Sequence, residues 1–316
     1  MPAMRDAFLD RIYEIAKEDQ QVILVSNDFG APALDKFRVD LASQFIHSGI
    51  AEQDMVNVAA GLELAGKIVY MYAMAPFLPM RCLEQMKVHM CLRNVAITAV
   101  SVGAGFSYEL SGPTHHTPED ISIMNAMPGL TLLSCSDSGM AAAFADLTYN
   151  NRVSTYIRFD REAVDPRYES IYDYSDGIAV LKPSKDIMII ATGIMVGQAL
   201  KVADELAKQG INAGVTDLYR IKPLNEELLL TTIGQAKCVV TIEENFLNGG
   251  IGSIIASFLL DRGIRMPFKR LGIPDKYYHE WGTREFMRSL CGLDIKNINI
   301  SIYEWLKNAR LLQFEA

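Results

Sequence analysis

Short apolar runs alternate with segments of helical spacing along almost the whole chain. The expected strands lie at 22–25, 68–72, 95–102, 130–133, 153–159, 187–191, 211–216 and 238–242. The expected helices lie at 4–15, 52–65, 83–91, 138–149, 195–209, 225–235 and 252–260. Brief apolar runs are typical of buried strands, and apolar residues three and four apart are typical of helices. The alternation predicts an α/β protein with mostly parallel sheets.

The alternation is interrupted once, by a segment rich in Tyr, Asp, Ser, Lys and Pro. We place an interdomain linker there, at 166–184, because polar stretches that contain proline commonly separate domains. The chain has 316 residues, which is enough for two domains of ordinary size. The sequence therefore predicts one domain at 1–165 and another at 185–316.

Charge and composition exclude several classes of protein. The net charge is -8 and no stripe of Lys and Arg is present, so nucleic acid is not an expected partner. No apolar run approaches the roughly 20 residues that span a bilayer, and the N-terminus resembles an amphipathic helix more than a secretory signal. The five cysteines are widely spaced, which supports neither a disulfide framework nor a zinc site. We expect a cytoplasmic protein without metal ligands of its own.

A glutamate stands at the start of the alanine-rich helix, in the segment Phe-Ile-His-Ser-Gly-Ile-Ala-Glu-Gln-Asp at 45–54. The simplest explanation of Glu52 is that its negative charge favours the helix N-terminus. The alternative is a carboxylate that takes part in chemistry. No Gly-x-Gly-x-x-Gly follows the first strand, so the main signature of a dinucleotide-binding protein is missing.

A Gly/Pro loop with two adjacent histidines, Ser-Gly-Pro-Thr-His-His-Thr, occupies 111–117. Thr117 as N-cap and Pro118 at the first helical position predict a helix that continues to Met127. Loops at the carboxyl ends of parallel strands are where α/β proteins bind ligands. The histidines are therefore candidates for catalysis, with loop polarity or a satisfied, partly buried imidazole as the competing explanation.

Two arginines, Arg158 and Arg161, flank the end of the expected strand at 153–159. They could form a fork for a phosphate or a carboxylate. They could equally form surface ion pairs with Asp160 or Glu162.

Taken together, the order and spacing of these segments resemble the transketolase superfamily, which includes deoxyxylulose-phosphate synthase and the beta subunits of 2-oxo acid dehydrogenases. Gly-Ile-Ala-Glu-Gln at 49–53 is similar to its cofactor-glutamate motif, and Gly-Pro-Thr-His-His at 112–116 to its substrate-histidine loop. The segments Met-Pro-Gly-Leu, Lys-Pro-Leu, Glu-Glu-Asn and Gly-Gly-Ile-Gly add to the likeness at 127–130, 222–224, 243–245 and 249–252. The resemblance implies a pyrimidine-binding domain followed by a transketolase C-terminal domain.

The resemblance also implies a set of cofactor residues for thiamine diphosphate. Glu52 matches the glutamate that hydrogen-bonds the pyrimidine ring nitrogen N1′, which requires a buried carboxyl that is protonated or shares its proton. Phe77 matches an aromatic residue that stacks on the pyrimidine, with simple core packing as the alternative. Tyr72 is a further candidate for the same wall, and Phe29 lies where some relatives support the bent cofactor.

Substrate residues follow from the same resemblance. His115 matches the histidine that contacts the substrate near its carbonyl or first hydroxyls. Arg161 matches an arginine that holds the sugar phosphate, and Arg158 matches less well. Ser111 replaces an aspartate that fixes an acceptor hydroxyl in relatives, and a histidine usually found further upstream is absent from 101–105. Both departures argue against ordinary pentose-phosphate substrates.

One half of the usual cofactor site is missing from the sequence. Full-length relatives hold the diphosphate through Mg²⁺ in a separate domain that carries Gly-Asp-Gly and a later Asn, and no Gly-Asp-Gly occurs here. A diphosphate needs its charge neutralised, and carboxylate and amide oxygens suit Mg²⁺. We therefore expect a second polypeptide, an N-terminal transketolase-type subunit, to bind Mg²⁺ and the diphosphate, in an assembly with two copies of each chain.

The leading hypothesis is a subunit that transfers a two-carbon ketol unit from a ketose to an aldose, with or without phosphate. The enzyme alternative is decarboxylation, as part of a split deoxyxylulose-phosphate synthase or as a 2-oxo acid dehydrogenase beta subunit. The alternative of another class is a non-catalytic scaffold subunit, although a scaffold needs neither Glu52 nor His115.

Overall fold

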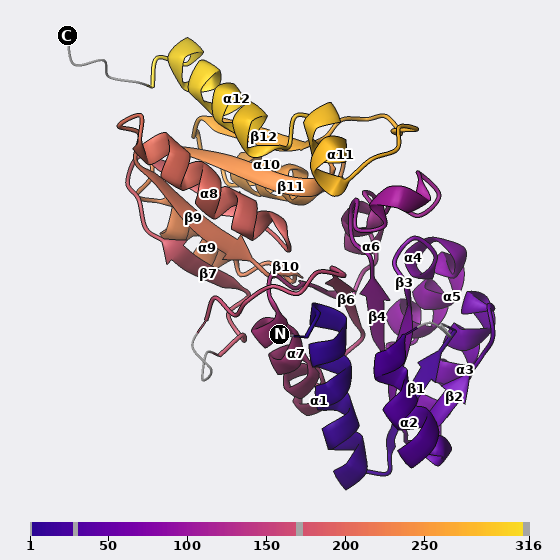
Figure 1. Cartoon of the computed structure of the whole chain (residues 1–316). Coiled ribbons are helices and arrows are strands. Elements are labelled where there is room, and N and C mark those ends of the chain that lie inside the picture. Colours follow the sequence, from indigo (N-terminus) through magenta and orange to yellow (C-terminus); the bar gives the residue numbers. More distant parts are fainter. Residues whose placement is uncertain (1, 28–30, 169–172, 312–316) are drawn as a thin grey trace.

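The chain forms two lobes, each built around one β-sheet with helices on its faces (Figure 1). This computed structural model describes residues 2–27, 31–168 and 173–311. In this described part the strands are β1 (Val22–Ser26), β2 (Phe45–His47), β3 (Ile68–Met74), β4 (Thr98–Val102), β5 (Thr131–Ser134), β6 (Thr155–Phe159), β7 (Ile178–Lys182), β8 (Ile187–Ala191), β9 (Ala213–Leu218), β10 (Arg220–Lys222), β11 (Cys238–Phe246) and β12 (Phe268–Ile273).

Helices connect these strands. The α-helices of the described residues are α1 (Met4–Glu18), α2 (Asp35–Asp40), α3 (Glu52–Leu64), α4 (Leu78–Arg81), α5 (Leu83–Met86), α6 (Asp120–Asn125), α7 (Ser138–Asn150), α8 (Met195–Ala207), α9 (Glu226–Ile233), α10 (Ile251–Asp261), α11 (Arg284–Leu290) and α12 (Ile295–Asn308). Short 3-10 turns are η1 (Pro32–Leu34), η2 (Ala42–Gln44) and η4 (Glu109–Ser111), and η3 (Lys87–Leu92) is a π-helix.

The first sheet has the order β10-β5-β6-β4-β3-β1-β2, and the second has the order β12-β11-β8-β9-β7. All pairs in the first sheet are parallel except β10 with β5, and all pairs in the second are parallel except β7 with β9. The prediction of an α/β protein with mostly parallel sheets is thus confirmed. The central strands are mostly apolar because helices cover a parallel sheet on both faces.

The border between the lobes differs from the predicted linker at 166–184. Strand β7 lies within that range and pairs antiparallel with β9 as the edge of the second sheet. Its short apolar stretch is embedded among polar residues, and only part of its surface is buried. An edge strand that is partly exposed carries a weak apolar signal, which explains why the sequence pattern missed it.

One strand from the second part of the chain joins the sheet of the first lobe. Residues Arg220–Lys222 follow the second-lobe strand β9, yet they form β10 at the edge of the first sheet, where they pair with β5. Lys222 then donates hydrogen bonds from Nζ to the carbonyl oxygens of Asn125 and Met127, at 2.8 and 2.6 Å. The predicted domain of 185–316 therefore contributes directly to the first sheet.

The helix expected after Thr117 begins later than predicted. Thr117 pairs instead with Gly105 in an antiparallel bridge, with backbone N–O distances of 2.8 and 3.1 Å. Helix α6 starts at Asp120, and the residue before it gives no side-chain cap. The bridge requires an extended backbone at Thr117, and this tertiary pairing outweighs the local capping preference. Similarly, the helix predicted at 83–91 is α-helical only in its first turn and continues as the π-helix η3.

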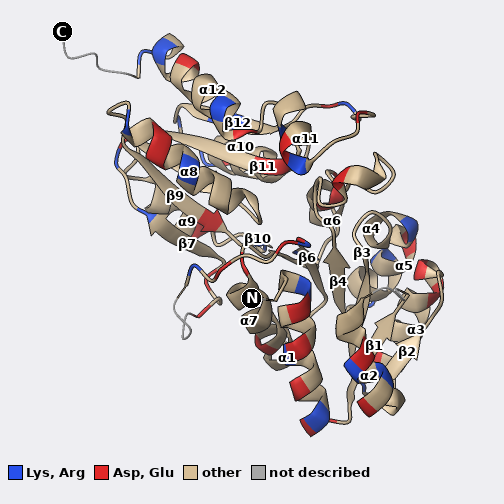
Figure 2. Cartoon of the chain, in the orientation of Figure 1, with Lys and Arg blue, Asp and Glu red and all other residues tan. Residues whose placement is uncertain are grey.

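The remaining predicted elements agree with the structure apart from their end residues. Helix α1 lies beside α7 in Figure 1 and buries its apolar face, including Phe8 and Ile12. Asn225 caps α9 as predicted, accepting a hydrogen bond from Leu228 N at 3.2 Å. Acidic and basic residues are interspersed on exposed helices such as α1 and α12 (Figure 2). In the described part of the chain, no helix combines the length and the apolar character that crossing a membrane requires.

Candidate active site

Four of the predicted site residues lie at the carboxyl edge of the first sheet. Glu52 follows β2, Phe77 follows β3, His115 lies in the loop after β4, and Arg161 follows β6. In a parallel sheet the carboxyl ends of the strands lie along one edge, where α/β proteins place their ligands. The fold therefore brings together side chains that are more than a hundred positions apart in the sequence.

Glu52 is the buried acid of this edge. It opens α3, and its side chain is only 4% exposed. Arg81 Nη1 donates to Glu52 Oε1 at 3.0 Å and to Oε2 at 3.2 Å, while the guanidinium carbon lies 3.9 Å from the ring centre of Phe77. A surface cavity of about 520 Å³ adjoins the pair and includes Asn57 and Ile50 in its lining. The carboxylate is thus buried in protein but reachable from this cavity.

A second group of side chains lies beside Phe77. The rings of His115 and Phe77 meet edge to face, with centres 5.4 Å apart. The ring centres of Tyr108 and His115 are 6.3 Å apart, and the guanidinium carbon of Arg161 lies over the Tyr108 ring, 4.5 Å from its centre. His115 is half-buried and Arg161 is exposed. Phe77 therefore connects the imidazole of His115 with Arg81 and the Glu52 region, and Tyr108 connects the exposed cation of Arg161 with the same imidazole.

The second histidine of the loop has different surroundings. His116 is 5% exposed and packs edge-on against Phe106, with ring centres 5.1 Å apart. Burial lowers its pKa, and its Nε2 has no hydrogen-bond partner among the described residues. His116 therefore belongs to the packed base of the loop, and His115 is the histidine that faces the site.

Two predicted contacts need correction. Tyr72 is 1% exposed and packs in the core that contains Phe8 and Phe159, whereas the core beneath α3 contains Met71 and Ala73. Side chains alternate across a strand, so Tyr72 faces away from Glu52. The structure therefore does not support Tyr72 as part of the cofactor wall.

Arg158 is the other correction. It is 5% exposed, and its Nε donates to Asp120 Oδ2 at 2.8 Å. Its Nη1 also reaches Ser134 Oγ at 3.3 Å. Arg158 thus forms a buried ion pair between β6 and α6, and of the two arginines only Arg161 has an exposed guanidinium. Ser111 is exposed at the end of η4, as a substrate contact requires. Phe29 lies outside the described residues.

Sequence reasoning missed Arg81 and Tyr108. Arg81 follows Phe77 by four positions at a helix start, a spacing that puts two side chains on one face, so its contact with Phe77 could have been anticipated. Tyr108 lies in a loop whose path is set by the bridge between Gly105 and Thr117. No local pattern predicts that bridge.

The second lobe holds the same loop through a buried network of charges. Arg284 Nη2 donates to Asp160 Oδ2 at 2.6 Å and to Glu244 Oε1 at 2.7 Å, and Arg288 Nε donates to Glu244 Oε2 at 2.6 Å. Glu244 Oε1 also accepts the backbone N–H of Phe106 at 2.8 Å. Despite the opposing effect of burial, the two guanidinium groups lower the pKa of Glu244 to about 2. Sequence reasoning gave no sign of this network.

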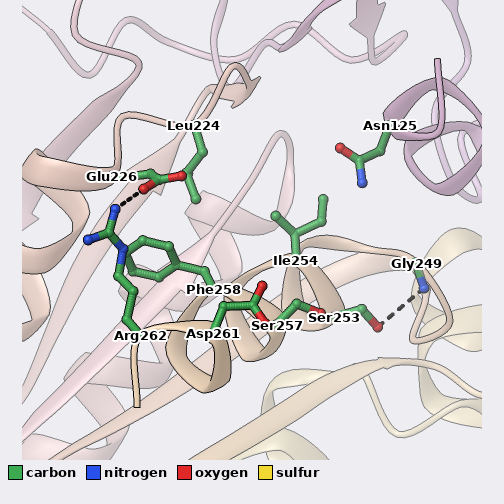
Figure 3. A pocket seen from close by; sticks show the side chains of 10 residues that line it. All are labelled: Asn125, Leu224, Glu226, Gly249, Ser253, Ile254, Ser257, Phe258, Asp261 and Arg262. Carbon is green, nitrogen blue, oxygen red and sulfur yellow. Dashed lines mark hydrogen bonds and ion pairs between the residues drawn. The ribbon is translucent and has the colours of Figure 1, made fainter. Parts of the chain in front are cut away.

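A second cavity, of about 610 Å³, lies between the lobes near α6, α9 and α10 (Figure 3). Ile254 and Phe258 give it an apolar wall, and an ion pair joins Glu226 to Arg262 at its rim. Asn125 reaches it from the first lobe. None of the predicted catalytic residues lines this cavity, so the candidate active site remains the edge that carries Glu52.

Comparison with known proteins shows the family to which the chain belongs. The model of the transketolase pyrimidine-binding domain matches residues 1–166, and that of the transketolase C-terminal domain matches residues 176–298. The chain therefore belongs to the transketolase family. Membership of this family implies thiamine diphosphate as the cofactor.

Among curated relatives, a 6-deoxy-6-sulfo-D-fructose transketolase subunit of Clostridium sp. (strain MSTE9) is 33% identical over 95% of this chain and 94% of its own length. An apulose-4-phosphate transketolase subunit of Phocaeicola vulgatus is 31% identical over 97% of this chain and 98% of its own length. A 1-deoxy-D-xylulose-5-phosphate synthase of Geobacter sulfurreducens is 31% identical over 92% of this chain, which spans 46% of that enzyme. A solved split-gene transketolase, described as an inactive beta4 tetramer, superimposes with a TM-score of 0.85 at 27% identity and covers 97% of this chain and 98% of its own.

Proposed function

We propose that this chain is the pyrimidine-domain subunit of a two-subunit, thiamine-diphosphate-dependent transketolase, which transfers a two-carbon ketol unit from a ketose to an aldose. The observation that carries the proposal is the buried carboxylate of Glu52 beside a cavity, with Arg81 joining it to the ring of Phe77. A carboxyl in protein surroundings and an adjacent aromatic face are the two features that an aminopyrimidine requires.

The residues present fit the pyrimidine end of the cofactor. Glu52 would share a proton with the ring nitrogen N1′, and Phe77 would stack against the ring. Arg81, which covers Phe77 and bonds to Glu52 in this structure, would give way to the ring when the cofactor binds. When bound, thiamine diphosphate supplies a nucleophilic carbon that can hold the two-carbon unit between donor and acceptor. Burial of Glu52 keeps water from competing for the shared proton.

His115 and Arg161 would act on the substrate. His115 is half-buried with its ring against Phe77, so it can move a proton at the carbonyl or hydroxyl oxygen of a sugar in the site. Arg161 presents an exposed guanidinium that lies over the ring of Tyr108, and a guanidinium suits an anionic group with several oxygens.

This arrangement favours a sugar with a terminal anion. One relative is named for a sulfonated fructose and the other for a phosphorylated apulose, so each substrate name contains a strongly anionic group. An exposed arginine can bind either a sulfonate or a phosphate. Ser111, in place of a carboxylate, would also avoid repelling such a group.

The proposal includes a partner chain. No Gly-Asp-Gly occurs in the sequence, and the family holds Mg²⁺ and the diphosphate with that motif. A second polypeptide would therefore supply the ligands of Mg²⁺ and the groups that bind the diphosphate. Two relatives that match nearly the whole chain are themselves named as subunits of their transketolases. We propose an assembly of two copies of each subunit, with Glu52 of this chain facing the metal site of the other polypeptide.

The test is a reconstitution. This chain, the product of a neighbouring gene that encodes Gly-Asp-Gly, and their mixture are assayed with thiamine diphosphate and Mg²⁺. The donors are fructose 6-phosphate, xylulose 5-phosphate and 6-deoxy-6-sulfofructose, each with an aldose phosphate as acceptor. We expect ketol transfer only in the mixture. Transfer by either protein alone would contradict the two-subunit proposal, and a mixture inactive with all three donors would contradict ketol transfer.

The decarboxylating alternative is tested in the same assay. The likeness to deoxyxylulose-phosphate synthases keeps this alternative open, although the chain spans only about half of those enzymes. Pyruvate with glyceraldehyde 3-phosphate should give no carbon dioxide if the chain is a transketolase subunit. Release of carbon dioxide at the rate of the best ketose donor would favour the synthase reaction.

A further inference from the structure

The second lobe reaches the candidate substrate loop through the segment 274–283, which connects β12 to α11 (Figure 1). At the end of the segment, the backbone N–H of Arg284 donates to Glu109 Oε2 at 2.7 Å. In its middle, Tyr278 is buried and packs edge-on against Phe106 with ring centres 6.2 Å apart. Both Glu109 and Phe106 belong to the loop that carries His115. The segment is therefore fixed against this loop at two points.

Between these two points lies Trp281. A Cβ placed on Gly112 would be 3.4 Å from the indole Nε1, so the indole lies close to the loop at the residue after Ser111. Even so, Trp281 keeps 76% of its surface exposed. A large aromatic side chain that lies beside the loop with most of its surface exposed is available to a ligand.

Arg284, which anchors this segment, is also connected to Arg161, the candidate residue for binding an anion. Arg284 Nη1 donates to Asp160 Oδ1 at 2.9 Å, and Ser107 Oγ donates to the same oxygen at 3.2 Å. Ser107 Oγ in turn accepts the backbone N–H of Arg161 at 3.2 Å. One buried network thus joins the backbone of Arg161 to Arg284, which follows Trp281 by three positions. Such a network can hold two recognition groups at a defined spacing.

We propose that Trp281 is a specificity-determining residue that the C-terminal domain contributes to the substrate site, an inference that rests on the proposed function. An indole offers an apolar face to the C–H groups of a sugar and an N–H donor to its hydroxyls. The resemblance to the transketolase superfamily implies that Ser111 stands where a carboxylate would fix an acceptor hydroxyl. Trp281 lies beside that position and recognises the acceptor aldose by packing.

The experiment uses the assembled enzyme with its second subunit, thiamine diphosphate and Mg²⁺. We compare the wild type with Trp281→Ala and Trp281→Phe. The control is Trp305→Phe, which changes the other tryptophan of the chain, located on α12. The assay uses the best donor of the reconstitution panel and varies the aldose phosphate acceptor. Thiamine diphosphate affinity and the affinity between the subunits are measured in parallel by calorimetry.

We expect Trp281→Ala to raise the KM for the acceptor about tenfold and Trp281→Phe to raise it less, because phenylalanine keeps an aromatic face. The two affinities should change by less than about twofold, as should every parameter of Trp305→Phe. An unchanged acceptor KM would overturn the inference. The inference would also be overturned if weaker association of the subunits accounted for the rise in KM, because Trp281 would then be a contact between the subunits. A wild-type mixture without ketol transfer would instead remove the proposed function, and this inference with it.

Discussion

Two buried glutamates of this chain, Glu52 and Glu244, differ in how they are paired. Glu244 is 3% exposed and bonds to Arg284 and Arg288, which are each 6% exposed. Glu52 is 4% exposed but bonds to one arginine that is 46% exposed. A buried carboxylate enclosed by buried guanidinium groups is fixed in one state. A buried carboxylate with one solvent-accessible partner can exchange that partner. The difference separates a structural acid from an acid available for chemistry.

The largest expected effect concerns the structural acid. Glu244→Gln leaves Arg284 and Arg288 with less compensated charge in the interior, so we expect a loss of about 3–5 kcal/mol in the free energy of unfolding. Denaturant unfolding at pH 7 measures it. Glu162→Gln is the matched control, because Glu162 bonds to the same Arg284 but is 52% exposed, and it should cost less than about 1 kcal/mol. Equal costs for the two variants would erase the distinction drawn here.

Glu52→Gln should reduce turnover strongly but change the free energy of unfolding little. We expect turnover of the reconstituted enzyme to fall at least about 100-fold, because proton transfer through the carboxyl is lost. Its free energy of unfolding should change by less than about 1 kcal/mol, since its partner among the described residues, Arg81, is half-exposed. Asp54→Asn, which alters an exposed acid in the same first turn of α3, is the control for turnover. Full activity of Glu52→Gln would remove Glu52 from the mechanism.

The pH dependence of stability distinguishes Glu244 from its neighbour Glu243. Burial raises the pKa of Glu243 to about 7, while the two arginines lower the pKa of Glu244 to about 2. Stability from Glu244 is present above its unfolded pKa and is lost as pH falls from about 4.5 to 2. Stability from protonated Glu243 is present below about 4.5 and is lost as pH rises towards 7. Each slope is at most about 1.4 kcal/mol per pH unit.

Unfolding curves collected from about pH 2 to pH 8 test these slopes. Glu243→Gln should flatten the curve between about pH 4.5 and 7, and Glu244→Gln should flatten it between about pH 2 and 4.5. Glu243 accepts the backbone N–H groups of Ile251 and Gly252 at 2.7 and 2.9 Å, contacts that a glutamine oxygen can partly keep. Identical curves for wild type and Glu243→Gln would contradict the raised pKa.

The smallest effect concerns Arg81. A double-mutant cycle with Arg81→Met and Glu52→Gln should give a coupling energy below about 1 kcal/mol in the free chain, because Arg81 is nearly half-exposed. A coupling above about 3 kcal/mol, the range of buried pairs, would show that Glu52 is as firmly held as Glu244. The comparison would then lose its basis.

Much of the fold followed from local patterns, because strands buried on both faces are continuous apolar runs. The predicted strand at 187–191 coincides with β8, for example. Strands β2, β7, β10 and β12 were missed, because each lies at a sheet edge where only part of its surface is buried. Their pairing depends on tertiary context, which no local window contains.

The site divides in the same way. The family resemblance selected Glu52, Phe77 and His115, and their common place at the carboxyl edge of a parallel sheet agrees with where α/β proteins bind ligands; their roles stay predictions. Tyr72 was misassigned because strand alternation turns it to the other face of the sheet. Arg284 and Trp281 were missed, because their contacts with the substrate loop join segments about 170 positions apart.

The most direct measurement is hydrogen–deuterium exchange at C2 of thiamine diphosphate in the reconstituted enzyme, followed by NMR after quenching in acid. This rate reports the proton transfer that depends on the acid at the pyrimidine ring and needs no knowledge of the sugar. The account predicts exchange at least about 100-fold faster with wild-type chain than with Glu52→Gln, with Asp54→Asn close to wild type. Equal rates for wild type and Glu52→Gln would contradict it.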